Sequence, residues 1–156
     1  MIKIAIVDDN LFLQKTVQEK LSFFEDVEIK SKSLNGKELL QKLEKNSNLD
    51  LILMDIEMPE MNGVEATAEV KKRYPHIKIL MLTVFDNDEK IFKSIKAGAD
   101  GYLLKEINPQ ELYNSIKETL SGGAAMTPSI ALKTLKLLRE PQVFETEEEK
   151  EKITLT

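Results

Sequence analysis

Apolar residues in the first 120 positions follow two different periods. Three short runs, at residues 2–7, 49–54 and 77–84, are apolar almost throughout and rich in Ile, Leu and Val, which predicts buried strands. A fourth run, at residues 27–33, alternates between apolar and polar positions and predicts a half-exposed strand. A brief run at residues 101–104 completes a set of five predicted strands.

Between these runs, apolar residues recur at helical spacing. The predicted helices cover residues 11–24, 36–45, 64–74, 87–97 and 109–120. Boundary signals support three of them: Pro75 lies beyond the third helix, Gly98 stops the fourth, and Asn108 is placed to cap the fifth, ahead of Pro109. Strand and helix therefore alternate five times.

This alternation, with strands that are apolar on both faces, predicts an α/β fold with a parallel sheet covered on both sides. Right-handed crossovers place the carboxyl ends of all strands at one edge, where ligands bind in such folds. Five polar residues directly follow strands and should meet at this edge, although they are far apart in sequence: Asp8, Asp9, Asp55, Thr83 and Lys105.

A loop and an additional helix are predicted at residues 122–139, after the alternating unit. Thr127 is placed to cap this helix and Pro128 to be its first residue. Ile130, Leu135 and Leu138 give it a partial apolar face.

Residues 140–156 are predicted to form an acidic linker. From Glu140 to Lys152 there are six glutamates and two lysines, which accounts for most of the net charge of −5. The remainder is nearly neutral and has no basic stripe, so unaided binding of nucleic acid is not expected. Cysteine is absent, which excludes disulfides and thiol catalysis. No apolar run approaches the roughly 20 residues of a membrane span, and a cytoplasmic location is expected.

Three carboxylates at one edge repel one another, and a divalent cation relieves that repulsion. Mg²⁺ takes oxygen ligands, often one or two carboxylates, and keeps room for waters and phosphate oxygens. Asp8, Asp9 and Asp55 therefore predict a site for Mg²⁺ (or Mn²⁺) that can accept phosphate. Asp55 follows the central strand and is the natural nucleophile for an aspartyl phosphate, with Lys105 and Thr83 able to reach its oxygens.

Four motifs carry a resemblance to a known family. They are VDD at the end of the first strand, MDIEMPEMNG around Asp55, LTVF at Thr83, and KAGADGYLLK leading to Lys105. Together they resemble the receiver domain of a two-component response regulator over residues 1–121. The resemblance implies a flavodoxin-like, doubly wound (βα)5 fold with strand order 2-1-3-4-5, here followed by the extra C-terminal helix.

The family's residue roles map onto this sequence position by position. Asp55 would be the phosphoacceptor, and Asp9 and Asp55 would be the Mg²⁺ ligands. Asp8 would act mainly through water and Glu57 through its backbone carbonyl. No organic cofactor is implied, and the chain would accept a phosphoryl group and lose it slowly without being an enzyme for a separate substrate.

The resemblance also implies a switch. Lys105 would bind a phosphate oxygen, while Thr83 and Tyr102 would change position together, Tyr102 rotating into the space that Thr83 leaves. The implied partner is a sensor histidine kinase, which would supply the phosphoryl group from its phosphohistidine.

Two further features resemble the LuxR/NarL-type regulators. The lysine in GYLLKE is not followed by proline, and SGGAAMTPSIA follows the fifth helix. The terminal ITLT resembles the start of a helix-turn-helix domain, which predicts a longer protein that controls transcription, with DNA bound only through that missing domain. A homodimer on phosphorylation would suit a palindromic DNA site.

Three alternatives remain open from the sequence. A stand-alone receiver would act by docking to another protein. A flavodoxin-like FMN protein shares the topology, but Asp8 and Asp9 would repel the flavin phosphate. An aspartate-nucleophile phosphatase needs an acid two residues after the nucleophile, and Glu57 has this spacing from Asp55. This alternative gives no role to Lys105.

Overall fold

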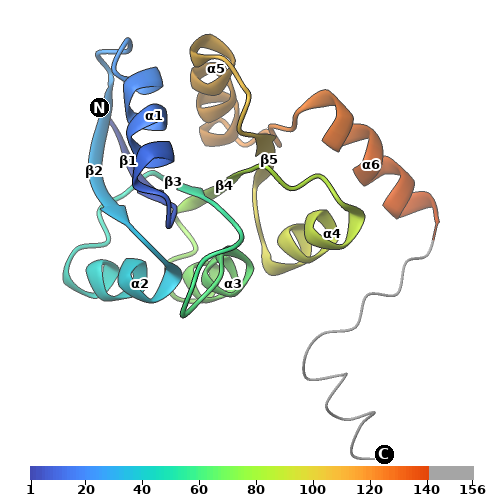
Figure 1. Cartoon of the computed structure of the whole chain (residues 1–156), viewed down its shortest axis with the longest axis horizontal. Coiled ribbons are helices and arrows are strands. Elements are labelled where there is room, and N and C mark those ends of the chain that lie inside the picture. Colours follow the sequence, from blue (N-terminus) through green and yellow to red (C-terminus); the bar gives the residue numbers. More distant parts are fainter. Residues whose placement is uncertain (141–156) are drawn as a thin grey trace, which may run out of the picture.

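A computed structural model describes residues 1–140, and its centre is a five-stranded parallel sheet (Figure 1). The strands are β1 (Ile2–Val7), β2 (Val27–Ser33), β3 (Leu51–Met54), β4 (Lys78–Thr83) and β5 (Gly101–Leu104). Their order in the sheet is β2-β1-β3-β4-β5, and every neighbouring pair is parallel. The expected flavodoxin-like order is therefore confirmed, and β3, which leads to Asp55, is central.

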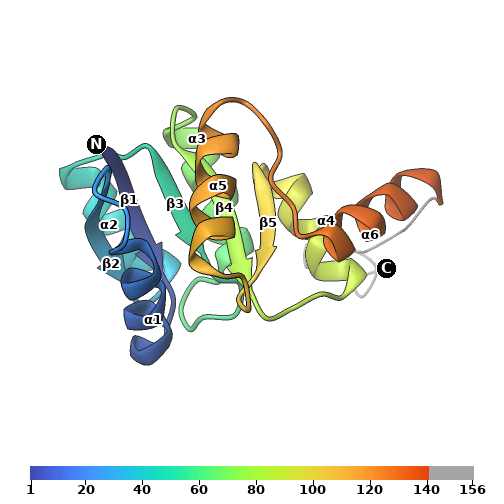
Figure 2. The same cartoon turned by 90° about the horizontal axis from the view of Figure 1, so that it is seen from above.

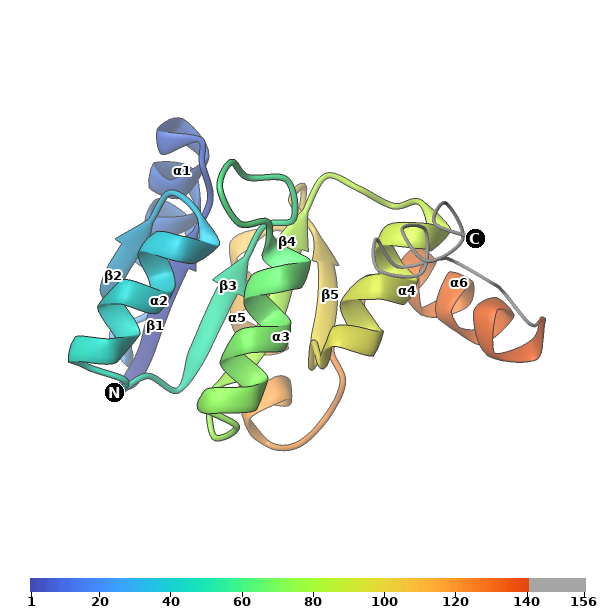
Figure 3. The same ribbon diagram turned by 90° about the horizontal axis from the view of Figure 1, so that it is seen from below.

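Helices cover both faces of the sheet. They are α1 (Leu11–Leu21), α2 (Gly36–Lys45), α3 (Gly63–Arg73), α4 (Asp88–Ala97), α5 (Pro109–Leu120) and α6 (Pro128–Arg139). Helices α1 and α5 lie on one face, in front of the strands in Figure 2, and α2, α3 and α4 lie on the other, in front of them in Figure 3. Helix α6 lies beyond β5, beside α4. Of the helices in the described part, none is both long and apolar enough to cross a bilayer.

The apolar character of the strands follows from this double cover. Successive residues of a strand point to opposite faces, so a strand covered on both sides needs apolar residues at every position. In β1, Ile4 and Ile6 pack in the cluster that includes residues of α1 and α5. Ala5 and Val7 pack in the cluster that includes residues of α2 and α3.

Several boundaries differ from those expected. The first helix ends at Leu21 instead of residue 24, because the backbone turns at Ser22 and Phe24 leaves the helix to stack on Tyr113, with ring centroids 4.0 Å apart. The third strand begins at Leu51 and not at residue 49, because the Leu49 N–H turns back to the Ser47 carbonyl and the first backbone bonds to the neighbouring strands are those of Asp50. The fourth strand is shorter by one residue at each end.

The expected additional helix is present, but two of its expected features are wrong. Thr127 precedes α6, yet its hydroxyl makes no cap hydrogen bond and instead accepts one from the Leu104 N–H of β5. Ile130 is fully buried, whereas Leu135 and Leu138 face solvent; Leu137, seven residues after Ile130, packs on the core instead. The expected acidic linker lies outside the described residues, apart from Glu140.

The loop between β3 and α3 is held tightly against the end of β3. The Gly63 N–H donates to the Ile56 carbonyl at 2.7 Å, which brings the first turn of α3 against the residues that follow the strand. A Cβ atom at position 63 would lie only 1.8 Å from the Asp55 carbonyl oxygen. Glycine at this position is therefore a steric requirement for the placement of Asp55.

We expect Gly63→Ala to lower the free energy of unfolding by about 3 kcal/mol or more, because backbone atoms must move to admit the methyl group. Urea unfolding followed by circular dichroism measures the change. Gly122→Ala is the control: its φ of +95° is unfavourable for alanine, but the added Cβ meets nothing within 4 Å, so a loss of about 1–2 kcal/mol is expected. If both variants lost the same free energy of unfolding, the close approach of residue 63 to the Asp55 carbonyl would not be what requires glycine there.

Candidate functional site

The carboxyl edge of the sheet gathers the polar residues that were expected there. Asp8 follows β1, Asp55 follows β3, Thr83 ends β4 and Lys105 follows β5. Backbone hydrogen bonds continue the ladder past the strand ends: the Asp55 N–H donates to Val7 and the Lys105 N–H donates to Thr83, both at 3.0 Å. These positions are therefore set by the sheet register and not by loops.

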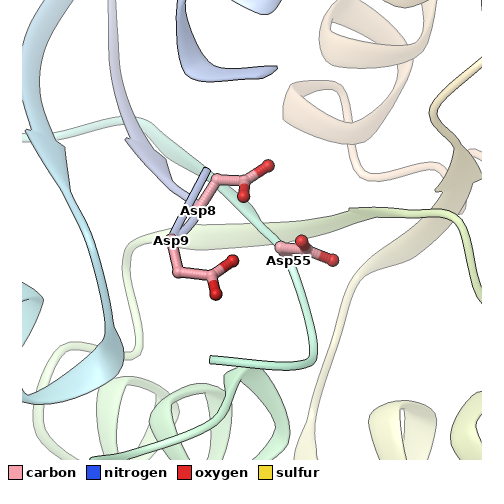
Figure 4. A group of neighbouring side chains, drawn as sticks. All are labelled: Asp8, Asp9 and Asp55. Atoms are coloured by element: carbon pink, nitrogen blue, oxygen red, sulfur yellow. The ribbon is translucent and has the colours of Figure 1, made fainter. Parts of the chain in front are cut away.

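Three carboxylates lie together at this edge (Figure 4). Each of Asp8, Asp9 and Asp55 offers an oxygen, and these oxygens lie within 4.8 Å of one another. Asp8 and Asp55 are only 3% and 7% exposed, whereas Asp9 is exposed. The group thus has a buried floor and one member open to solvent.

The Lys105 ammonium joins the two buried carboxylates. Its Nζ lies 2.7 Å from Asp8 Oδ2 and 2.8 Å from Asp55 Oδ2, and the three side chains are at most 10% exposed. Both contacts are charge-assisted hydrogen bonds, which are stronger than neutral ones. Each carboxylate keeps a second oxygen for the backbone: Asp8 Oδ1 accepts from the Asn10 N–H and Asp55 Oδ1 from the Ile56 N–H.

Burial and the ion pairs act in opposite directions on these charges. Burial raises the pKa of Asp8, and the hydrogen bond from Lys105 only partly offsets this. Burial alone would lower the pKa of Lys105, but its hydrogen bonds to Asp55 and Asp8 outweigh that effect and raise it. Lys105 is therefore a firmly charged cation at neutral pH.

Two residues that the sequence did not single out support this arrangement. The side-chain amide of Gln14 is buried and donates to the carbonyls of Asp8 and Ser33, which fixes the turn after β1. Lys20 Nζ donates to the Lys105 and Ile107 carbonyls and so holds the loop after β5 against α1. In the sequence, the only sign of this role is that Gln14 is a polar residue on the face of the helix that carries Val17 and Leu21.

The donor set fits a small, hard divalent cation. It consists only of carboxylate oxygens, which Mg²⁺ prefers over nitrogen or sulfur ligands. Two oxygens on opposite sides of one Mg²⁺ lie about 4.2 Å apart, so the observed limit of 4.8 Å is only slightly longer than a shared ion requires. Lys105 leaves the cluster of three acids with a net negative charge, which further favours a cation.

Thr83 and Tyr102 both form hydrogen bonds to the backbone of the same residue, Phe85. The Thr83 hydroxyl accepts a long hydrogen bond of 3.4 Å from the Phe85 N–H, and the Tyr102 hydroxyl donates a short one of 2.6 Å to the Phe85 carbonyl. Burial raises the pKa of the Tyr102 phenol, so the hydroxyl keeps its proton for this bond. Phe85 is the last residue of the motif LTVF, but the sequence indicated no role for it.

Tyr102 is fully buried, and its ring lies within the core cluster. The expected rotation into a space that Thr83 leaves stays a prediction. A segment whose position was not predicted lies beside Tyr102: residues 125–127 pair with the Tyr102 backbone and cover the outer edge of β5.

Glu57 lies apart from the three carboxylates. Its side chain forms an ion pair with Lys90 of α4, and the two are 58% and 27% exposed. The Lys90 ammonium also lies 4.8 Å from the centre of the Phe85 ring. The acid two residues after Asp55 is thus engaged with α4 and not with the cluster.

Comparison with known families gives a match over most of the chain. Residues 4–117 match the model described as the response regulator receiver domain. The transcriptional regulatory protein DegU of Brevibacillus brevis is 36% identical over 150 residues, which cover 96% of this chain and 62% of that protein. The response regulator protein VraR of Staphylococcus aureus is 36% identical over 132 residues, or 85% of this chain and 63% of VraR. The chain thus spans less than two thirds of either relative.

Solved structures agree with the fold. A LuxR-family two-component response regulator from Aurantimonas sp. SI85-9A1 has a TM-score of 0.81 at 25% identity, covering 88% of this chain and 98% of that one. A CheY-like receiver domain protein from Methanospirillum hungatei JF-1 has a TM-score of 0.70 at 34% identity, covering 78% and 95%. The expected similarity to LuxR-type regulators is confirmed.

We expect Lys105→Met to lower the free energy of unfolding by about 3 kcal/mol at pH 7 without divalent cations, the lower end for breaking a buried pair. The change leaves Asp8 and Asp55 facing each other with no counter-charge. Urea unfolding in a chelating buffer measures it.

Lys90→Met is the matched control, because it removes an exposed ion pair and should cost less than about 1 kcal/mol. If the two lysine variants were equally stable, the bridge between the carboxylates would not contribute to the fold.

Proposed function

The chain belongs to the response regulator receiver domain family, and we propose that Asp55 accepts a phosphoryl group in a Mg²⁺-dependent reaction. The observation that carries this proposal is the placement of Asp55: a nearly buried carboxylate on the central strand, within 4.8 Å of two other acids and 2.8 Å from a lysine ammonium. A carboxylate that serves only as a cap or a surface charge needs none of these neighbours.

Asp9 and Asp55 would hold the metal directly, with Asp8 acting through water and the Glu57 backbone carbonyl as a further ligand. When bound, Mg²⁺ (or Mn²⁺) supplies positive charge that orients the donor phosphate and offsets the repulsion between its oxygens and the carboxylates. Asp9, the exposed member, gives access from solvent.

In the transfer, an Asp55 carboxylate oxygen forms a bond to phosphorus in line with the leaving group. The bond from phosphorus to the donor breaks, and the electron pair leaves with the imidazole nitrogen of a kinase phosphohistidine or with the carboxylate of a small acyl phosphate. Lys105 offsets the charge of the equatorial oxygens. Its ammonium already contacts Asp55 and needs little movement to contact a phosphate there.

Thr83 would provide the response to the new group. A phosphoryl oxygen on Asp55 is a strong acceptor at the end of the neighbouring strand, and the 3.4 Å hydrogen bond that holds the Thr83 hydroxyl at Phe85 is long and weak. Movement of the hydroxyl toward the phosphate would release the Phe85 N–H. Thr83 and Tyr102 would then act together through the backbone at Phe85, with Tyr102 following the space that Thr83 leaves.

The wider role is a signalling one. DegU is named as a transcriptional regulatory protein and VraR as a response regulator protein. We place this chain, by analogy, in the cytoplasm, with a sensor histidine kinase as donor and dimerisation on phosphorylation as output. Control of transcription would fall to a DNA-binding part outside residues 1–140.

We expect the chain to gain one phosphoryl group when incubated with Mg²⁺ and a small acyl phosphate, and Asp55→Asn to gain none. The reason is that an amide is too weak a nucleophile and too poor a metal ligand to replace the carboxylate. Intact-protein mass spectrometry measures the gain, and a chelator should prevent it.

Asp88→Asn is the matched control, because Asp88 is an exposed acid at the start of α4 and is not a member of the carboxylate cluster. Its uptake should equal that of the unchanged chain. Uptake that persists in Asp55→Asn, or that does not depend on a divalent cation, would contradict the proposed function.

A further inference from the structure

Residues 125–127 form an additional attachment at the outer edge of the sheet. The Tyr102 N–H donates to the Ala125 carbonyl at 2.9 Å, and the Thr127 N–H donates to the Tyr102 carbonyl at 3.2 Å. The Thr127 hydroxyl accepts from the Leu104 N–H at 3.0 Å. The chain therefore enters α6 while bonded to Tyr102 and Leu104 of β5, and Leu104 is the last residue of β5 before Lys105.

Helix α6 is then fixed by one face. Ile130 is fully buried and Leu137 packs on the same core cluster, which also contains Tyr102 and Ile91 of α4. These two positions are seven residues apart and lie on the same side of the helix. From this side, Lys133 reaches the loop between β4 and α4: its Nζ donates to the Asp86 carbonyl at 2.6 Å and lies 3.8 Å from the Asp86 carboxylate.

The loop that Lys133 holds is the loop that Thr83 and Tyr102 hold. Phe85 bonds to the Thr83 hydroxyl through its N–H and to the Tyr102 hydroxyl through its carbonyl. Asp86, the next residue, bonds to Lys133. One short stretch of backbone thus joins the end of β4, the buried tyrosine and α6. Phe85 and Asp86 share a peptide bond. A shift of the Phe85 backbone therefore also moves Asp86, whose carbonyl accepts the hydrogen bond from Lys133.

We propose that α6 is coupled to the acidic site through Phe85 and Asp86, so that a phosphoryl group on Asp55 loosens α6 from its place beside α4. The proposal rests on the proposed function, since it takes phosphorylation of Asp55 as the input. The Phe85 N–H loses its bond to Thr83, the loop shifts, and the Lys133 hydrogen bond to Asp86 is broken or lengthened. Helix α6 then keeps its apolar anchors and the attachment of residues 125–127 to β5, but loses its contact with the loop.

The coupling must work in both directions, because linked equilibria are reciprocal. If the phosphorylated arrangement weakens the Lys133 contact, that contact must in turn oppose the phosphorylated arrangement. Removing it should therefore favour binding of a phosphoryl mimic at Asp55. If α6 only covered the outer edge of the sheet, removing the Lys133 contact would not change the affinity of Asp55 for the mimic.

The test is the affinity of the chain for beryllium fluoride in the presence of Mg²⁺, measured by isothermal titration calorimetry. Lys133→Ala should bind this phosphoryl mimic more tightly, by about two- to fivefold, because the coupling cannot exceed the free energy of this exposed contact. Lys136→Ala is the matched control: it removes the same charge from the same helix, at an exposed position three residues away. Its affinity should equal that of the unchanged chain.

Amide hydrogen exchange provides a second readout that does not depend on a substitution. Beryllium fluoride with Mg²⁺ should speed exchange in peptides covering residues 125–139, while peptides from β1 and β3 remain protected. Lys133→Ala should already show part of this increase without the mimic.

The outcomes separate the two proposals. Equal affinities for Lys133→Ala and Lys136→Ala, or unchanged exchange in residues 125–139 when the mimic is bound, would overturn the coupling and leave phosphorylation of Asp55 intact. Failure of the unchanged chain both to bind the mimic and to take up a phosphoryl group would instead overturn the proposed function, and the coupling with it.

Discussion

The bridge formed by Lys105 between Asp8 and Asp55 is the interaction on which the site depends. Two nearly buried carboxylates would repel each other at the carboxyl edge of the sheet, and a single ammonium within 2.8 Å of both makes their burial tolerable. The same ammonium is placed where a phosphate on Asp55 would need a cation. One contact therefore stabilises the fold and prepares the proposed chemistry. Much of the surrounding structure, including Gln14 at the turn after β1 and Lys20 at the loop after β5, fixes the parts that this contact joins.

The fold and the members of the site could be predicted from the sequence because both follow from the sheet. Strands that are apolar on both faces require helices on both sides, and parallel strands bring Asp8, Asp55, Thr83 and Lys105 to one edge. What could not be predicted depends on single side-chain and backbone contacts. Thr127 looked like a helix cap, but the edge of β5 offered its hydroxyl an N–H that a local pattern cannot reveal. The backbone pairing of residues 125–127 with Tyr102 likewise depends on a segment distant in sequence, and no local pattern indicates it.

The position of α6 connects this helix to the acidic site through the loop between β4 and α4. Phe85 carries no chemistry of its own, yet its two backbone groups meet the hydroxyls of Thr83 and Tyr102, and the next residue meets Lys133. The hydrogen bond from the Phe85 N–H to the Thr83 hydroxyl is already long, at 3.4 Å, so a small movement at the end of β4 would break it. The exposed side of α6, with Leu132, Leu135 and Leu138, is then carried with the helix. Site, loop and α6 form a contiguous path from the central strand to the last described helix.

The central claim is that Asp55, and neither of the neighbouring aspartates, carries the phosphoryl group. Reductive cleavage with borohydride tests it most directly, because it converts the acyl phosphate of an aspartate into homoserine, which peptide mass spectrometry can locate. After incubation with Mg²⁺ and an acyl phosphate, we predict homoserine at position 55 and intact aspartate at positions 8 and 9. Homoserine at position 8 or 9, or none at position 55 in a chain that has gained a phosphoryl group, would contradict the account.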